Sequence, residues 1–280
     1  MKIIEIQGGL GNQLFLYTFW RWMQKKFPDE TIYGVYPSRA LAAHNGLEIE
    51  KWFDVSMPPV SLSSNIIGET CFWLNKILRR LHLPIPYCSD DTNPKPDALF
   101  HDGYFQDLKY QEGVIMPSFR DDLSLDENNK KILEKLCKEN AVAVHVRRGD
   151  YHKNKITNQI YGGICTEEYY QKAIEVAKAE IKNAKFFFFS DDEKYVKSTF
   201  NVDNMTIVNI NKGDRSFFDM YLMAHAGNMI LANSTFSCWA AYLNKNVKNV
   251  YCPSRWVNIE PKPNLIKADW KIIQREVCSQ

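Results

Sequence analysis

The residues best suited to chemistry lie at the end of one predicted strand, in the stretch AVAVHVRRGD, residues 141–150. Its first six residues are almost all small or β-branched, as in a strand buried on both faces of a parallel sheet. Arg147 and Arg148 follow this strand directly. Ligands of open α/β sheets bind just beyond the carboxyl ends of the strands, and the planar guanidinium group fits phosphate oxygens. We therefore predict that the two arginines bind an anionic ligand such as a phosphate.

Polar residues follow two more predicted strands in the second half of the chain. Ser190, Asp191 and Asp192 follow the run FFFF, and the segment NSTFS, residues 233–237, follows the strand expected over 228–232. A helix that begins within NSTFS offers free backbone N–H groups and the positive end of its dipole to an anion. Together with the two arginines, this helix start would form a clamp for a pyrophosphate.

Structural roles compete with ligand binding at these positions. Helix capping alone would explain Ser234 or Thr235, and an ion pair with Asp150 or Asp191 would explain Arg147. Two consecutive arginines at the end of a buried strand favour a ligand, so we predict binding.

A glycine-rich turn, GGLGNQ, follows the first predicted strand. It is not followed by Gly-Lys-Ser/Thr, so it is not a P-loop, and Leu14 stands where a dinucleotide fingerprint has a third small residue. The turn therefore argues against a nicotinamide-dependent dehydrogenase. It could still bring backbone N–H groups close to a ligand.

The acidic residues do not suggest a metal site. The pairs Asp121-Asp122 and Asp191-Asp192 are adjacent in sequence, so their side chains diverge on a strand, and no Asp-x-Asp motif is present. Without a metal, the charge of a leaving diphosphate is stabilised by arginine and a helix dipole. We predict a reaction that needs neither metal nor other cofactor.

Alternating strands and helices would position these groups. In the second half, strands are expected over 141–146, 185–189, 205–210, 228–232 and 249–252, with helices over 126–139, 166–182, 193–199, 216–226 and from 234 or 235 to 243. The chain opens with a strand over 2–7, a helix over 13–27 and a strand over 31–36; only a strand near 99–104 stands out in 37–120. We expect an α/β protein of two doubly wound, Rossmann-type domains, 1–135 and 136–280, facing across a cleft.

Composition narrows the function classes. The formal net charge of +2 over 280 residues gives no reason to expect nucleic-acid binding, and seven dispersed cysteines without a CxxC pair favour free thiols in a reducing compartment. No signal peptide or membrane-spanning segment is evident, so we expect a cytoplasmic protein. The segment 66–87 mixes large apolar residues with Lys76, Arg79 and Arg80. It is either a domain helix with a basic outer face or a helix that rests peripherally on an anionic membrane.

Four motifs together resemble the bacterial α-1,2-fucosyltransferases of glycosyltransferase family 11, which are related to the blood-group H enzymes. They are GGLGNQLF, HVRRGDY, SDD and NSTFSCWAAYL, in the family's order. The resemblance implies a GT-B-like fold and metal-independent, inverting transfer of L-fucose from GDP-fucose to the 2-hydroxyl group of a terminal β-galactoside. It further implies synthesis of a bacterial surface polysaccharide at the inner face of the membrane, on an oligosaccharide that can be lipid-linked.

The resemblance also implies roles for single residues. Arg147 would bind the β-phosphate and stabilise it as it leaves, with Arg148 sharing or supporting this contact. His145 would face the guanosine, and Asp219 would accept hydrogen bonds from guanine, unless it is an ordinary charge near a helix start. Further donor contacts are implied for Gly9, Gly11, Asn12, Gln13, Asp191, Ser234, Thr235, Phe236 and Ser237.

The general base and the exact activity stay open. Asp150 is a candidate base, although the neighbouring arginines would lower its pKa and weaken it; His152, Asp102 and Glu112 are alternatives. The rival functions are a glycosyltransferase of the same scaffold that uses another nucleotide sugar and a non-catalytic sugar-binding protein.

Overall fold

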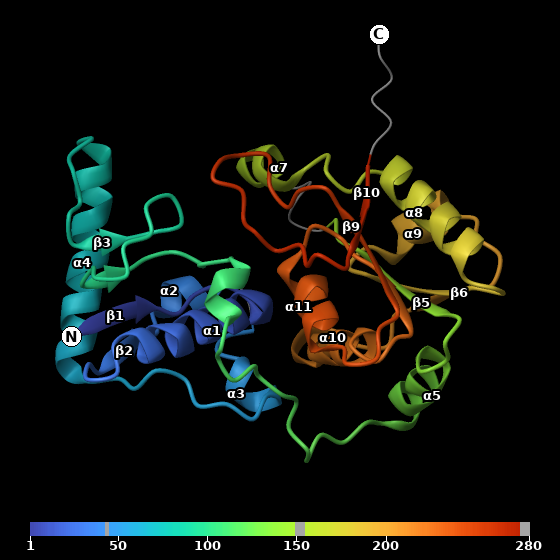
Figure 1. The fold of residues 1–280 in the computed structure, drawn as a ribbon, viewed down its shortest axis with the longest axis horizontal. Helices are drawn as coiled ribbons and strands as arrows, with labels where there is room; N and C mark the ends of the chain where they lie inside the picture. The colour runs from blue at the N-terminus through green and yellow to red at the C-terminus, as the bar shows by residue number, and fades with distance from the viewer. Residues whose placement is uncertain (43–44, 149–154, 275–280) are drawn as a thin grey trace, which may run out of the picture. The chain divides into compact units, whose positions relative to one another are not determined.

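Residues 1–42, 45–148 and 155–274 are described by a computed structural model, in which the chain divides into unit 1, Met1–Leu123, and unit 2, Ser124–Gln280 (Figure 1). This division comes earlier than the expected boundary at 135/136. The reason is helix α5 (Glu127–Leu136), which packs on the sheet of unit 2, where the Leu136 carbonyl accepts the Gly227 N–H at 3.1 Å.

Unit 1 contains a parallel four-stranded sheet in the order β2-β1-β4-β3. The strands are β1 (Lys2–Glu5), β2 (Ile32–Val35), β3 (Cys88–Ser89) and β4 (Phe100–His101). Successive side chains of a strand point to opposite faces, so the sheet has a core on each side. Ile3, Val35 and Phe100 pack with residues of helix α4, whereas His101 packs against Phe19 of helix α1.

The helices of unit 1 begin at identifiable caps. Helix α1 (Leu10–Lys26) starts earlier than expected, directly after a turn in which Gly8 has φ +76° and Gly9 is the N-cap. Helix α4 (Leu62–Arg80) begins with a capping box between Ser61 and Ser64. The segment 37–120 also contains α2 (Ser38–Leu41), α3 (Ile49–Trp52) and the 3-10 helix η1 (Leu108–Gln111).

Unit 2 contains a parallel six-stranded sheet in the order β10-β9-β8-β5-β6-β7. The strands are β5 (Ala141–Val146), β6 (Lys185–Ser190), β7 (Met205–Val208), β8 (Asn228–Ile230), β9 (Asn249–Pro253) and β10 (Lys271–Ile273). The five strands expected from sequence are confirmed, and β10 is an additional edge strand. All six residues of β5 are buried, as its apolar pattern predicts.

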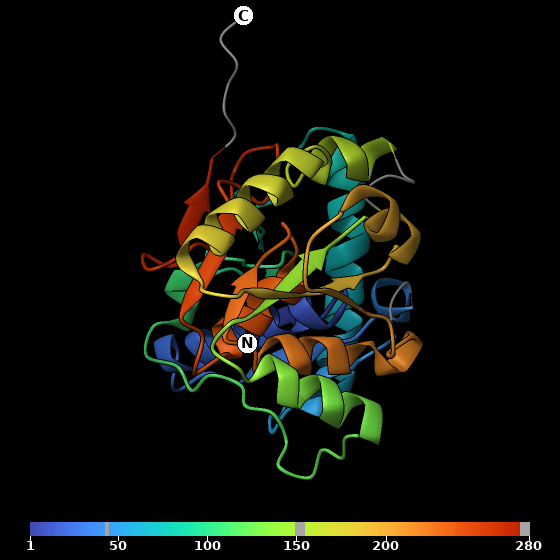
Figure 2. The same ribbon diagram turned by 90° about the vertical axis from the view of Figure 1, so that its right-hand side faces the viewer.

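Helices cover both faces of this sheet, so the predicted doubly wound architecture is confirmed for unit 2 (Figure 2). Helices α8 (Glu167–Glu180) and α9 (Glu193–Thr199) pack on one face. The other face is covered by α5, α10 (Phe217–Met223) and α11 (Thr235–Leu243), with the 3-10 helix η2 (Gly213–Ser216) leading into α10. Helix α7 (Lys155–Tyr161) precedes α8.

The strand order reverses direction at one place in unit 2. From β5 the chain adds β6 and β7 on one side, then crosses over to add β8, β9 and β10 on the other. In doubly wound sheets, the carboxyl ends of the two strands at this reversal form the crevice that binds ligands. The topology therefore points to the residues that follow β5 and β8.

Candidate functional site

The three polar strand ends predicted from sequence lie at one edge of the unit 2 sheet. All six strands are parallel, so the residues after β5, β6 and β8 share the carboxyl edge. Arg147 and Arg148 follow β5, and Ser234 follows β8, its neighbour at the reversal. The arginine pair and the start of α11 are thus placed together at the position where this topology binds ligands.

Arg147 is held by an acidic residue from the neighbouring strand. Its Nη1 lies 2.9 Å from Oδ2 of Asp191, and Oδ1 of the same carboxylate accepts the backbone N–H of Arg148 at 3.0 Å. The ion pair considered from sequence therefore forms. The Arg147 side chain is still 35% exposed, and a solvent-exposed ion pair contributes only about 1 kcal/mol, so an incoming diphosphate can compete for the guanidinium group.

Arg148 is directed away from Arg147, toward helix α9. Its guanidinium carbon lies 3.6 Å from the centre of the Tyr195 ring, and its Nε lies 3.7 Å from Oδ2 of Asp192. Asp192 also caps α9 by accepting the backbone N–H of Tyr195. Stacking and this ion pair fix the direction of Arg148 and suit it to a supporting role.

His145 is buried in β5, two residues before Arg147 and on the same side of the strand. Its ring centre lies 5.8 Å from that of Phe236, and Nδ1 has no hydrogen-bond partner in the described part of the chain. Burial, and then the charge of Arg147, lower the pKa of His145 to about 4. The imidazole is therefore neutral at physiological pH and can give a ligand one donor and one acceptor.

The hydroxyl groups at the start of α11 are engaged within the turn itself. Ser234 Oγ accepts the N–H of Phe236 at 3.3 Å, so the capping alternative applies to Ser234. Ser237 is fully buried, and its Oγ donates to the carbonyls of Ala232 and Ser234 at 3.4 Å. The Ser237 hydroxyl is thus used by local structure, whereas Ser234 Oγ only accepts in its bond, and the partly exposed Thr235 and Phe236 lie nearer to solvent.

No individual role is expected for Asn233 from the sequence, but the structure gives this residue one. Its Nδ2 donates to the carbonyls of Tyr161 and Trp256 at 3.0 and 3.1 Å. Asn233 thus joins α7, the end of β8 and the segment after β9. An asparagine immediately before a capping serine was the only sequence signal for this junction.

Asp219 is held by a network that begins in α5. Asn211 donates to Oδ1 of Asp219 at 2.8 Å, and the amides of Asn211 and Asn129 exchange two hydrogen bonds of 2.9 and 3.0 Å. Both asparagines are buried. Burial raises the pKa of Asp219 to about 7, even though the bond from Asn211 lowers it. Sequence reasoning missed both asparagines, because they belong to no motif and meet only in the folded chain.

In unit 1, β1 and β4 are neighbouring parallel strands, so the residues that follow them share the carboxyl edge of its sheet. Gly9 is the N-cap of α1, and Gly11 lies buried inside its first turn. Oδ1 of Asn12 accepts a 3.0 Å hydrogen bond from Gln106 Nε2, which joins the turn after β1 to the segment after β4. Gly9 and Asn12 therefore lie where a ligand of unit 1 would bind, whereas Gly11 offers only helical backbone.

Gln13 has a structural role in place of the expected donor contact. Its Nε2 donates to the carbonyls of Gly8 and Gly46, and its Oε1 accepts the N–H groups of Glu48 and Ile49, all at 2.8–3.1 Å. The side chain is fully buried. Its hydrogen bonds therefore hold the glycine-rich turn against α3.

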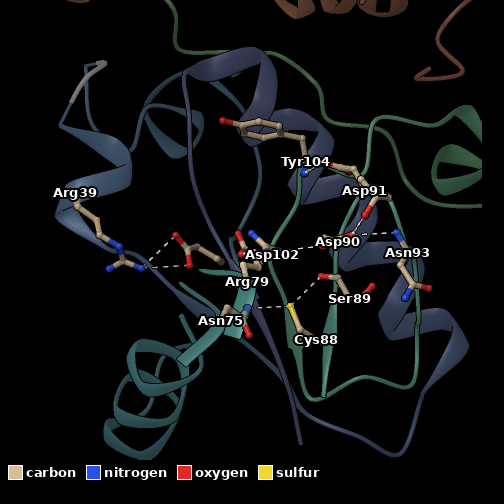
Figure 3. A network of polar contacts seen from close by, with 12 residues as sticks. Arg39, Asn75, Arg79, Cys88, Ser89, Asp90, Asp91, Asn93, Asp102 and Tyr104 are labelled. Atoms are coloured by element: carbon tan, nitrogen blue, oxygen red, sulfur yellow. Dashed lines mark hydrogen bonds and ion pairs between the residues drawn. The ribbon is translucent and has the colours of Figure 1, made fainter. Parts of the chain in front are cut away.

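The candidate bases in unit 1 differ in their surroundings. Asp102 is mostly buried and lies 3.4 Å from Arg79, which also binds Asp90 at 3.0 Å (Figure 3). Glu112 is exposed and follows η1. The other two candidates, Asp150 and His152, lie outside the described residues. In the described ranges, no three His, Cys, Asp or Glu side chains are grouped so that they could hold a metal ion.

Comparison with known proteins gives matches along most of the chain. Residues 71–273 match the model of glycosyl transferase family 11. The O-antigen biosynthesis glycosyltransferase WbnK of Escherichia coli is 28% identical over 95% of this chain and 98% of its own length. The α-1,2-colitosyltransferase of Escherichia coli is 26% identical over 92% and 98%. Galactoside α-(1,2)-fucosyltransferase 1 of Rattus norvegicus is 30% identical, over 36% of this chain and 27% of its own length.

Two solved structures are similar at low sequence identity. The α-1,6-fucosyltransferase NodZ soaked with GDP-fucose has a TM-score of 0.46 at 14% identity, over 89% of this chain and 94% of that chain. POFUT1 in complex with GDP-fucose has a TM-score of 0.45 at 13% identity, over 90% and 97%.

Proposed function

Because this chain belongs to glycosyl transferase family 11, we propose that it transfers L-fucose from GDP-fucose to the 2-hydroxyl group of a terminal β-galactoside. Membership makes the chain a glycosyltransferase, and its two α/β units with parallel sheets agree with the GT-B-like fold predicted from sequence. The choice of donor and acceptor is the proposal, and the placement of Arg147 carries it.

Arg147 is suited to the diphosphate of the donor. It follows β5 at the strand-order reversal, is paired with Asp191, and has a side chain that is 35% exposed. When the bond from the sugar C1 to the β-phosphate breaks, negative charge grows on the phosphate oxygens. A cation already fixed beside these oxygens stabilises that charge without reorganising.

Asp219 is suited to select guanine. In the described residues, Asn211 is the group that donates to Oδ1, and Oδ2 stays available as an acceptor. Guanine offers two adjacent donors, N1–H and the 2-amino group, which a carboxylate can accept together. Uracil and adenine lack this pair, so Asp219 would favour a guanosine diphosphate. The neutral imidazole of His145 would face the nucleoside without opposing the cation at Arg147.

The proposed chemistry is a direct displacement with inversion. The acceptor 2-hydroxyl oxygen forms a bond to C1 from the face opposite the diphosphate, the C1–phosphate bond breaks, and the hydroxyl proton passes to a base. We propose Asp150 as that base, and no metal or cofactor takes part. Because neighbouring arginines weaken such a base, positioning and stabilisation of the leaving GDP would supply most of the acceleration.

Unit 1 would contribute to acceptor recognition, with Asn12 and the segment after β4 at the carboxyl edge of its sheet. The similar WbnK protein is named as an O-antigen biosynthesis enzyme, which supports a bacterial surface polysaccharide as the product. We propose an oligosaccharide acceptor that ends in galactose and that can be lipid-linked, with the enzyme on the cytoplasmic side of the membrane.

Colitosyl transfer is a second candidate, favoured by the similarity to the α-1,2-colitosyltransferase over almost the whole chain. Colitose is fucose without its 3-hydroxyl group. The two donors share the guanosine diphosphate contacts argued above, so the nucleotide site alone does not separate them.

Titration calorimetry with GDP, GDP-fucose, GDP-mannose and UDP tests the donor. We expect GDP and GDP-fucose to bind at least about a hundredfold more tightly than UDP, because UDP leaves Asp219 unpaired. Tight binding of UDP but not of GDP would contradict the proposal.

Transfer assays test the acceptor and the second candidate. GDP-fucose and GDP-colitose are offered with β1,3- and β1,4-linked galactosides, and the product linkage is determined by NMR. We expect fucose on O2 of galactose. Preference for colitose would support the second candidate, and galactoside binding with neither transfer nor donor hydrolysis would indicate a non-catalytic sugar-binding protein.

A further inference from the structure

Helix α4 packs on unit 1 through its small side chains. The residues buried against the sheet are Ser64, Gly68, Cys71 and Asn75. At Gly68 the approach is so close that an added Cβ would lie 3.1 Å from Val35 Cγ1. A surface helix ordinarily turns its large apolar residues toward the core. In α4 only Ile67 and Phe72 follow this rule clearly, and the residues of closest approach are small.

Four other large apolar residues of α4 point to solvent. Leu62, Ile66, Trp73 and Ile77, which we call the apolar stripe, are 54–79% exposed. Their spacing of four and seven residues places them on one face of the helix, opposite the small residues. The exposed segment 81–83, with Leu81 and Leu83, continues this apolar surface. A continuous exposed apolar surface marks an interaction site.

The charged side chains that border the apolar stripe are mostly positive, and the one acidic side chain among them is paired. Lys76 and Arg80 are exposed, and Lys76 Nζ lies 4.8 Å from the centre of the Trp73 ring. Arg79 is also exposed, although it pairs with Asp90 on its inner side. Glu69 is the one acidic residue of α4, and it pairs with Arg39 at 2.5 Å. The outer surface of the helix is therefore apolar and cationic.

We propose that α4 docks this protein onto the surface of a bilayer that contains anionic phospholipids. The apolar stripe would enter the boundary between headgroups and acyl chains, where Trp73 has its preferred position, and Lys76 and Arg80 would pair with lipid phosphates. The helix has 19 residues, about 28 Å of length, and would lie in the plane of the interface. In the described ranges, no helix is long and apolar enough to cross a membrane.

A second copy of the chain is a poorer occupant of this surface. Two facing α4 helices would bury Lys76 and Arg80 without an acidic side chain opposite them, because Glu69 is already paired. Burying unpaired cations is costly, whereas anionic headgroups neutralise them. The proposal concerns binding alone and does not depend on which sugar the enzyme transfers.

Co-sedimentation of the full chain with lipid vesicles tests the proposal. Vesicles of phosphatidylethanolamine with about a third phosphatidylglycerol supply the anionic surface, and phosphatidylcholine vesicles the neutral one. We expect at least about tenfold stronger binding to the anionic vesicles, weakened by salt. Ile66→Asp and, separately, Lys76→Glu with Arg80→Glu should each reduce this binding about tenfold or more.

Ile115→Asp is the matched control. Ile115 is 71% exposed, but it lies two residues after Gly113, whose carbonyl contacts Lys25 of α1 on the other face of the sheet. This variant should bind vesicles like the wild type. Circular dichroism and donor hydrolysis by the α4 variants should match the wild type, because none of these residues belongs to the donor site.

Two results would overturn the proposal. In the first, the wild type binds anionic and neutral vesicles equally, and Ile66→Asp does not change this binding. The other is a wild-type dimer in sedimentation equilibrium that Ile66→Asp converts to a monomer, without vesicle binding by either form. The vesicle measurement does not depend on the sugar donor. The proposals of GDP-fucose as donor and of membrane docking by α4 can therefore fail independently of each other.

Discussion

The carboxylate of Asp191 binds Arg147 and the residue after it through different oxygens. Oδ2 lies 2.9 Å from Nη1 of Arg147, and Oδ1 accepts the backbone N–H of Arg148 at 3.0 Å. One acidic residue at the end of β6 therefore determines both the direction of the Arg147 side chain and the course of the backbone after β5. The arginine is held in place before any ligand binds, which is the condition for efficient electrostatic stabilisation.

Replacing Arg147 by alanine should lower the rate of transfer about a hundredfold or more, because it removes the cation that would stabilise the leaving diphosphate. The measurement is kcat for transfer to a galactoside, with circular dichroism to verify the fold. Arg120→Ala is the matched control, since Arg120 pairs with Asp122 on the surface of unit 1. Retention of most of the wild-type kcat in Arg147→Ala would rule out the phosphate role.

Asp191→Asn should separate positioning from binding. The asparagine can still accept the Arg148 N–H, but it no longer attracts the guanidinium group of Arg147 or competes with phosphate for it. We expect GDP to bind at least as tightly as in the wild type, while kcat falls about tenfold because Arg147 is less well oriented. Asp203→Asn is the control, since Asp203 is an exposed residue between α9 and β7, away from the arginine pair. An unchanged kcat in Asp191→Asn would show that the ion pair has no positioning role.

GDP affinity should depend on pH through Asp219. Its pKa is raised to about 7 by burial, so the carboxyl group is increasingly protonated as the pH falls below 7. Guanine needs the ionised form as acceptor, so affinity should decrease by up to about tenfold per pH unit below 7 and level off above it. Titration calorimetry from acidic to mildly alkaline pH measures this dependence.

Two variants show whether Asp219 is the titrating group. Asp219→Asn should bind GDP weakly and almost independently of pH. Asn211→Ala removes the hydrogen bond that lowers the pKa of Asp219, so its affinity should begin to fall at a higher pH than in the wild type. A pH profile that both variants share with the wild type would assign the dependence to another group.

Gln13→Leu should destabilise unit 1. Leucine has a similar volume but leaves the buried N–H groups of Glu48 and Ile49 without an acceptor. We expect the free energy of unfolding to fall by about 2–4 kcal/mol, measured by urea unfolding followed by circular dichroism. Gln24→Leu, on the same helix, removes one partly buried hydrogen bond to Arg21 and should cost less than about 1 kcal/mol. Equal effects of the two variants would contradict the structural role of Gln13.

Much of unit 2 could be predicted from sequence because local patterns determine it. The apolar run 141–146 corresponds to β5 residue for residue, and the expected helix 193–199 coincides with α9. The helix start at Ser234 or Thr235 could also be predicted, with capping as an alternative to ligand binding, because capping depends on neighbouring residues alone. The position of Arg147 at the ligand edge follows from the same logic, since it needs only a buried parallel strand and its carboxyl end.

Only the tertiary structure decided which groups meet. The sequence allowed Asp150 or Asp191 as a partner of Arg147, and strand pairing brings Asp191 to it, whereas Asp150 lies outside the described residues. Asn129 and Asn211 come together because α5 packs beside the segment that leads into α10, and no short-range pattern records such a contact.

Helix α4 is a second case in which the sequence pattern does not decide the packing. Its periodicity reveals that two faces differ, but not which of them packs on the sheet. The answer depends on how closely the helix approaches Val35, and there Gly68 permits a contact that larger residues would prevent. The sequence by itself therefore determined five of the six strands of unit 2, the polar residues at their ends and the family. Long-range packing decided the partner of Arg147, the setting of Asp219 and the outward direction of the apolar stripe, because these depend on residues distant in sequence that become neighbours only on folding.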